Sequence, residues 1–105
     1  MSQFHLYENT NKATQKTYPY FVDIQSDLLD TLNSRVVIPL TPLSTSDKSY
    51  PAHLCPTLTI NDAHFALLTH QITSVSVNFL RECEGSVASN RDKIIAAIDF
   101  LVTGI

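Results

Sequence analysis

Three aspartates lie close together in the chain, at Asp23, Asp27 and Asp30. Neighbouring carboxylates can perform general acid–base chemistry when their surroundings separate their pKa values. Aspartate and serine are also common N-cap residues of helices and turns. We interpret this cluster as a cap, formed by Ser26 or Asp27, together with solvated acids, and we assign no catalytic residue.

The histidines and cysteines do not form a recognisable metal or nucleophile motif. A zinc site needs three or four ligands at characteristic spacing, whereas the only close pair is His53 and Cys55. A catalytic cysteine needs an activating base and an orienting group, so we interpret Cys83, in the charged segment RECEG, as a half-buried thiol without a role. We expect no metal, no cofactor and no enzymatic activity, and we read His64 and His70 as ordinary strand residues.

The composition indicates one folded domain, spanning residues 1–105. The chain is 44% hydrophobic and 16% charged, which is enough apolar material for a core and argues against disorder. Its formal net charge of −3 lacks the basic excess of a nucleic-acid binder and favours a protein partner.

The N-terminal segment MSQFHLYENT has neither the basic nor the apolar region of a secretion signal. No apolar run approaches the roughly 20 residues of a membrane span. We therefore expect a cytoplasmic protein with reduced thiols and no membrane contact.

Alternating apolar residues predict a set of antiparallel strands. The hairpin around Asn61-Asp62-Ala63 is the best defined, because Asn and Asp tolerate the left-handed backbone of a tight turn. Expected strands are Gln3–Glu8, Tyr18–Gln25, Arg35–Leu40, Thr57–Ile60, His64–Thr69 and Ser74–Leu80; Asn9–Thr17, Thr41–Pro56 and Glu82–Ser89 are expected to be connections. Loops as long as Thr41–Pro56 are uncommon and often functional.

The last segment predicts a helix with more than one apolar face. Ser89 and Asp92 fit a capping box, and one face carries Ile94, Ile98, Leu101 and Ile105. A neighbouring face carries Ile95, Asp99 and Val102. The fold class is therefore mainly β, a small bent sheet or barrel with one C-terminal helix.

Some apolar residues occupy positions that a simple core does not explain. In Leu28-Leu29, on a short turn, one side chain is expected to be exposed. Exposed apolar patches usually mark association sites. From pattern alone, a second interpretation stays open, in which these leucines and the second helix face belong to the core.

Three stretches, FVDIQSDLLDT, VVIPL and AIDFLVTGI, resemble the CcdB family of toxin–antitoxin toxins, and the order of the other segments agrees along nearly the whole chain. The resemblance implies an SH3-like barrel with a C-terminal helix and a homodimer. It also implies a toxin that binds the DNA gyrase A subunit and traps the gyrase–DNA cleavage complex without catalysing a reaction. A CcdA-like antitoxin would neutralise it, and only their complex would bind operator DNA and repress the operon.

The resemblance also implies site residues. The gyrase-binding set comprises Leu28, Leu29, Asp99, Val102, Thr103, Gly104 and Ile105, and the dimer-interface set comprises Ile98 and Leu101. Val102-Thr103 stand where the family typically has an aromatic pair, and Asp99 stands where it has asparagine.

Two alternatives remain. MazF/Kid-like endoribonuclease toxins share the barrel, and their acid–base and basic groups would here be Arg35, Asp23 and His53; the acidic net charge opposes RNA binding. The other alternative, suggested by Thr103, is a toxin that has lost activity and persists as an antitoxin-binding protein.

Overall fold

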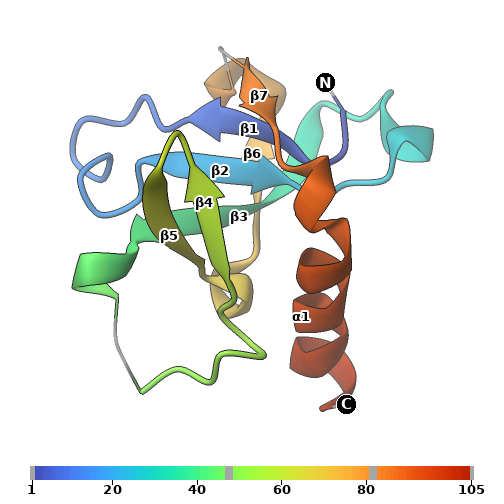
Figure 1. The fold of residues 1–105 in the computed structure, drawn as a ribbon. Helices are drawn as coiled ribbons and strands as arrows, with labels where there is room; N and C mark the ends of the chain where they lie inside the picture. The colour runs from blue at the N-terminus through green and yellow to red at the C-terminus, as the bar shows by residue number, and fades with distance from the viewer. Residues whose placement is uncertain (1, 47–48, 81–82, 105) are drawn as a thin grey trace.

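A strongly bent antiparallel sheet curls beside one C-terminal helix (Figure 1). The structure, a computed structural model, describes residues 2–46, 49–80 and 83–104. The strands are β1 (His5–Glu8), β2 (Tyr20–Asp23), β3 (Ser34–Pro42), β4 (Thr57–Ile60), β5 (Ala63–Leu67), β6 (Thr73–Ser76) and β7 (Cys83–Ser86), and the helix is α1 (Arg91–Thr103). The predicted class, a small SH3-like barrel with a C-terminal helix, is confirmed.

Strand β3 is the centre of the sheet. One edge pairs with β2, while the other pairs first with β6 and then with β5, in the order β4-β5-β3-β2-β1-β7 with β6 beside β3. Pro39 lies between the part of β3 that pairs with β6 and the part that pairs with β5. Its carbonyl accepts a hydrogen bond from Leu68 N at 3.0 Å, and a strand residue's N–H and C=O point to the same side. The missing N–H therefore falls at the interruption, where proline removes no ladder bond.

The β4–β5 hairpin is confirmed. Asn61 and Asp62 have φ values of 50° and 66°, as a two-residue type I′ turn requires. Ala63 pairs with Ile60 and begins β5, so the turn is one residue shorter than predicted.

Alternate residues of the central strands enter two apolar clusters. Leu6, Val22 and Ile38 contribute to the cluster that contains Ile94 of α1. Tyr7, Phe21 and Val37 form the second with Leu80, and Val75 and Phe79 pack against it. The central strands are therefore buried on both faces.

Several predicted boundaries were wrong. The strand predicted at Ser74–Leu80 ends at Ser76, and Val77–Phe79 forms the 3₁₀ helix η4. The predicted connection Glu82–Ser89 contains β7, whose residues are exposed and thus lack alternation. Strand β3 continues through Thr41 and Pro42 into the predicted loop.

The helix ends also differ from expectation. Asn90 is the N-cap and no side chain caps α1, so the predicted capping box of Ser89 and Asp92 is wrong; the 3₁₀ helix η5 (Ala88–Asn90) leads into α1 instead. At the other end Gly104, with a φ of 74°, donates its N–H to the Phe100 carbonyl at 2.9 Å. This left-handed residue is a common helix stop.

Burial decreases along α1. Ile94 and Ala97 are fully buried and Ile98 is half-buried, whereas Leu101 is 37% exposed and Val102 75% exposed. The first half of the helix therefore anchors it, and the apolar face continues beyond the core.

We predict that Ile94→Ala lowers the free energy of unfolding by about 2–4 kcal/mol, because it leaves a cavity in the main core. Leu28→Ala, at a 93% exposed position, should change it by less than about 0.5 kcal/mol. Urea denaturation of both variants measures the difference. Equal losses would contradict the assignment of Ile94 as the anchor.

Candidate protein-binding surfaces

The turn after β2 presents three leucines to solvent. It contains the 3₁₀ helix η1 (Asp27–Leu29), and Leu28, Leu29 and Leu32 are 93%, 49% and 48% exposed. The sequence predicted one exposed leucine in the Leu28-Leu29 pair, but both are exposed. The exposure of Leu32 was not predicted. Its position, four residues after Leu28 and three after Leu29, was a usable signal. We call these three residues the leucine turn.

The start of this turn is held by local and distant contacts. The hydroxyl of Ser26 accepts a hydrogen bond from Leu28 N at 3.2 Å, which confirms Ser26 as the cap. The Asp27 carboxylate accepts a hydrogen bond from Gln3 N at 2.9 Å. Asp27 thus links the turn to the segment that precedes β1.

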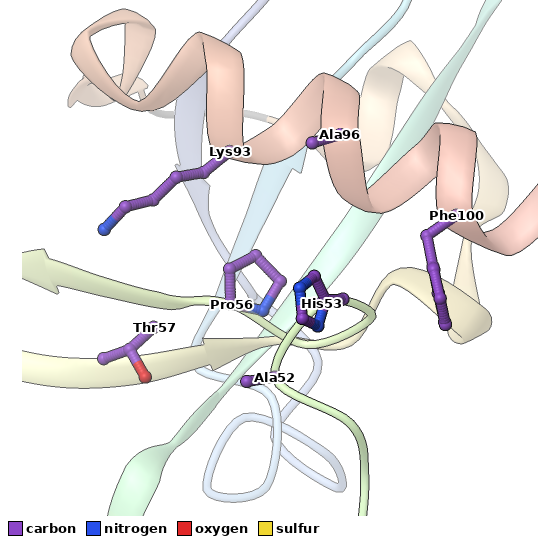
Figure 2. Close-up of a pocket in the computed structure, with 7 residues that line it drawn as sticks. All are labelled: Ala52, His53, Pro56, Thr57, Lys93, Ala96 and Phe100. Atoms are coloured by element: carbon purple, nitrogen blue, oxygen red, sulfur yellow. The ribbon is translucent and has the colours of Figure 1, made fainter. Parts of the chain in front are cut away.

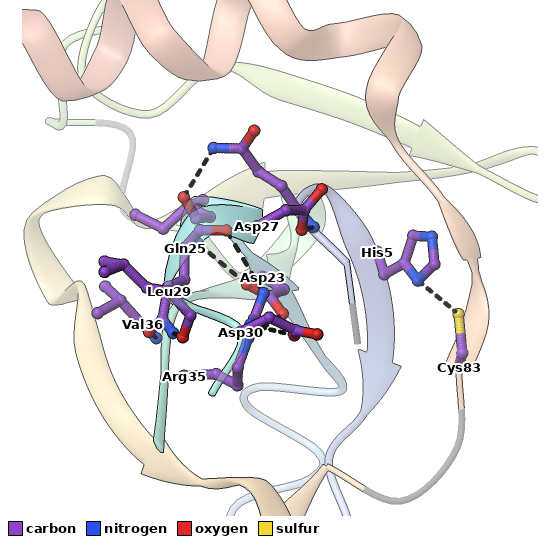
Figure 3. A network of polar contacts seen from close by, with 11 residues as sticks. His5, Asp23, Gln25, Asp27, Leu29, Asp30, Arg35, Val36 and Cys83 are labelled. Carbon is purple, nitrogen blue, oxygen red and sulfur yellow. Dashed lines mark hydrogen bonds and ion pairs between the residues drawn. The ribbon is translucent and has the colours of Figure 1, made fainter. Parts of the chain in front are cut away.

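Beneath the turn, Arg35 joins three parts of the chain (Figure 3). Its Nε donates to Asp23 Oδ2 at 2.7 Å, Nη1 donates to Asp30 Oδ1 at 3.0 Å, and Nη2 donates to the Gln25 carbonyl at 3.4 Å. The side chains of Arg35 and Asp23 are only 1% and 0% exposed. Burial alone would lower the pKa of Arg35, but the hydrogen bond and negative charge of Asp23 outweigh this effect and the pKa is raised.

The side chain of Gln25 forms a hydrogen bond to β3 just beyond the end of the β2–β3 ladder. Its Oε1 accepts a hydrogen bond from Val36 N at 3.0 Å, and its Nε2 donates to the Leu29 carbonyl at 3.0 Å. Its own N–H donates to Asp23 Oδ1 at 3.0 Å. The amide therefore fastens the leucine turn to β3, which leaves the exposed leucines on a fixed backbone.

These contacts correct the interpretation of Asp23 as a solvated acid. It is fully buried and its oxygens are occupied by Arg35 and Gln25. Neither Asp23 nor Arg35 is open to a substrate, and His53 lies in a different place, facing α1 (Figure 2). Of the three residues considered for an endoribonuclease, Asp23 and Arg35 are therefore paired in the interior, and His53 does not join them.

The end of α1 forms the second exposed surface. Asp99, Val102 and Thr103 share an exposed face, and Leu101 lies beside them. The Thr103 hydroxyl donates to the Asp99 carbonyl at 2.7 Å, so it is turned back onto the helix. Gly104 is exposed and ends the helix, and Ile105 lies outside the described residues. We call residues 99 and 101–104 the helix end.

The two surfaces lie far apart in one chain. In Figure 1 the leucine turn is the cyan segment at the upper right, whereas the helix end is red and at the bottom. The predicted gyrase-binding set is therefore divided between two places. Sequence alone gave no signal of this separation.

The two thiols have different surroundings. Cys83 is exposed rather than half-buried, with Sγ 3.6 Å from His5 Nδ1 (Figure 3). Cys55 is buried, which raises its pKa, and its Sγ lies 3.7 Å from His70 Nδ1. Within residues 2–46, 49–80 and 83–104, no three His, Cys, Asp or Glu side chains are grouped to hold a metal ion. Over the same residues, no helix is long and apolar enough to cross a membrane.

Comparison with protein families identifies a match over nearly the whole chain. The model of the family described as "CcdB protein" matches residues 3–104. The matched region includes the leucine turn, the buried Arg35 network and the helix end.

We predict that Asp23→Asn lowers the free energy of unfolding by about 3–5 kcal/mol, since it leaves the buried Arg35 without its closest charge partner. Asp30→Asn is the matched control. Its side chain is 56% exposed, so the loss should stay below about 1 kcal/mol. Denaturant titrations compare the two, and equal effects would show that Asp23 is not the main partner.

Proposed function

This chain belongs to the CcdB family of toxin–antitoxin toxins, and we propose that it binds the DNA gyrase A subunit and traps the gyrase–DNA cleavage complex. One observation carries the proposal. Aliphatic side chains are largely exposed at both places where the family resemblance puts gyrase contacts, with Leu28 93% and Val102 75% exposed. Large exposed apolar residues in a small protein are characteristic of an interaction surface.

We infer that the toxin acts by binding and is not an enzyme. Its best acid–base candidate, Asp23, is buried against Arg35, and burial raises the pKa of the Cys55 thiol, which disfavours a thiolate nucleophile. The exposed leucines, in contrast, sit on a backbone that Gln25 and Arg35 hold in place. Such rigidity reduces the entropy lost on binding.

The proposed homodimer would use Ile98 and Leu101. Ile98 is half-buried and Leu101 is 37% exposed, so both retain apolar surface that a second copy could cover. In a two-fold interface the same patch serves both protomers. Asp99, Val102, Thr103 and Gly104 of the helix end, together with the final residue Ile105, would then be left for gyrase.

The other partners follow from the family. A CcdA-like antitoxin would neutralise the toxin, and the complex would repress its own operon. The net charge of −3 supports contact with operator DNA only through the antitoxin, because phosphate binding depends on cationic side chains. We place the protein in the cytoplasm, where gyrase acts.

We predict that induced expression kills a bacterium with sensitive gyrase and spares an otherwise identical strain with a resistant gyrase A subunit. Colony counts after induction measure the effect, and double-strand breaks should appear only in the sensitive strain. Equal killing in both strains would refute gyrase as the target. No killing in either strain, despite folded protein, would favour a toxin that has lost activity.

We further predict that Leu28→Asp and Val102→Asp each weaken binding to a gyrase A dimerisation fragment roughly ten- to a hundredfold, because each removes one buried aliphatic side chain and adds a charge. Ala13→Asp, an exposed position on another loop, is the matched control and should bind as the wild type does. Calorimetric titration gives the affinities. If one variant binds normally, that surface is not a gyrase contact.

A further inference from the structure

A cleft of about 400 Å³ lies between α1 and the segment that leads into β4 (Figure 2). This segment belongs to the long stretch Thr41–Pro56, which the proposed gyrase function does not use. The cleft is separate from the set of exposed residues assigned to gyrase. Its lining residues are Ala52, His53, Pro56, Thr57, Lys93, Ala96 and Phe100.

The cleft follows from the periodicity of α1 and from two small side chains. Lys93, Ala96 and Phe100 are spaced by three and four residues and share one helix face, different from the face of Ile94 and Ala97 that enters the core. Ala96 lies on the helix side of the cleft and Ala52 on the opposite segment. Because both side chains end at Cβ, the two elements enclose a space rather than filling it.

The two ends of the cleft differ in chemistry. Figure 2 shows the Lys93 side chain extending toward the Thr57 end, while the Phe100 ring lies at the other end beside His53. The His53 and Phe100 rings are 6.0 Å apart between centroids and inclined by 32°. Pro56 lies between the two ends. The cleft thus has a cationic end and a flat apolar end.

The cation is available for a ligand. Lys93 makes no ion pair with any carboxylate in the described part of the chain, whereas Arg91 and Arg35 both have acidic neighbours. The nearby Thr57 side chain adds a hydroxyl that can donate or accept a hydrogen bond. An anionic group is the natural complement of an ammonium that forms no ion pair within the described residues.

We propose that this cleft binds a small organic anion, a carboxylate attached to a flat apolar or aromatic body. The carboxylate would meet Lys93, and the body would lie between Pro56, Ala96 and Phe100. The volume falls within the range of small-molecule sites, which combine a mainly apolar lining with a few polar groups. A polyanion such as RNA fits poorly, because among the described residues the lining supplies one lysine and no arginine. The proposal does not depend on gyrase binding.

The test uses the full chain and two probes of nearly the same shape, the anion 3-phenylpropionate and its neutral amide. Amide resonances are followed in a ¹⁵N-labelled sample during titration. We expect saturable shifts centred on residues 52–57 and 93–100, with the acid binding about three- to tenfold more tightly than the amide. Equal affinities, shifts centred elsewhere or no saturable shift would overturn the proposal.

Three variants locate the interaction. Lys93→Met keeps the apolar stem and removes the charge, so the acid should bind only as weakly as the amide does. Ala96→Leu fills the cleft and should abolish saturable binding of both probes. Lys12→Met removes a charge from an exposed loop residue outside the cleft and should change nothing.

Both cleft substitutions are at exposed positions, so the fold should tolerate them, and an unchanged spectrum outside the cleft verifies this. Wild-type affinity of Lys93→Met for the acid would refute the role of the charge. Wild-type binding of both probes by Ala96→Leu would refute the location.

Discussion

The buried guanidinium of Arg35 is the constraint on which the arrangement of the leucine turn depends. A charged group removed from water is tolerated only when it is paired and its donors are satisfied. Here the partners come from three places: Asp23 at the end of β2, the Gln25 carbonyl just beyond it, and Asp30 after η1. Satisfying them fixes the path of the turn. The leucines consequently keep much of their apolar surface in solvent, nearly all of it in Leu28 and about half in Leu29 and Leu32, where it is available to a partner.

The periodicity of α1 separates three faces that have different surroundings. Ile94 and Ala97 enter the core, Lys93, Ala96 and Phe100 line the cleft, and Asp99, Val102 and Thr103 are exposed. The core contact is concentrated in the first half of the helix. The second half can therefore present apolar residues to a partner while the first half keeps the helix in place.

The separation of the leucine turn from the helix end bears on how a gyrase poison of this type could work. If both surfaces contact gyrase, either one protomer makes a broad contact, or the leucine turn of one protomer acts together with the helix end of the other protomer in a dimer. Thr103 cannot supply an aromatic anchor, and its hydroxyl is already bonded to the helix backbone. Affinity would then come from several aliphatic contacts, including Leu28 and Val102, rather than from one large ring.

Local patterns in the sequence determined a substantial part of this protein. Asn61-Asp62 predicted the hairpin because its turn geometry involves only adjacent residues, and the spacing of Ile94, Ile98 and Leu101 predicted the helix. Motifs shared with the CcdB family identified the family, which the match to residues 3–104 confirmed. The predicted gyrase and dimer contacts remain predictions.

Only the tertiary structure decided that Asp23 is buried against Arg35. It also decided that β7 pairs with β1 from some 80 residues away, where Ser86 lies opposite His5. The separation of the two exposed surfaces was likewise decided by the tertiary structure. The physical reason is that burial, ion pairing and edge-strand pairing depend on residues distant in sequence. A local pattern can show that a side chain is acidic or apolar, but not which side chain it will meet.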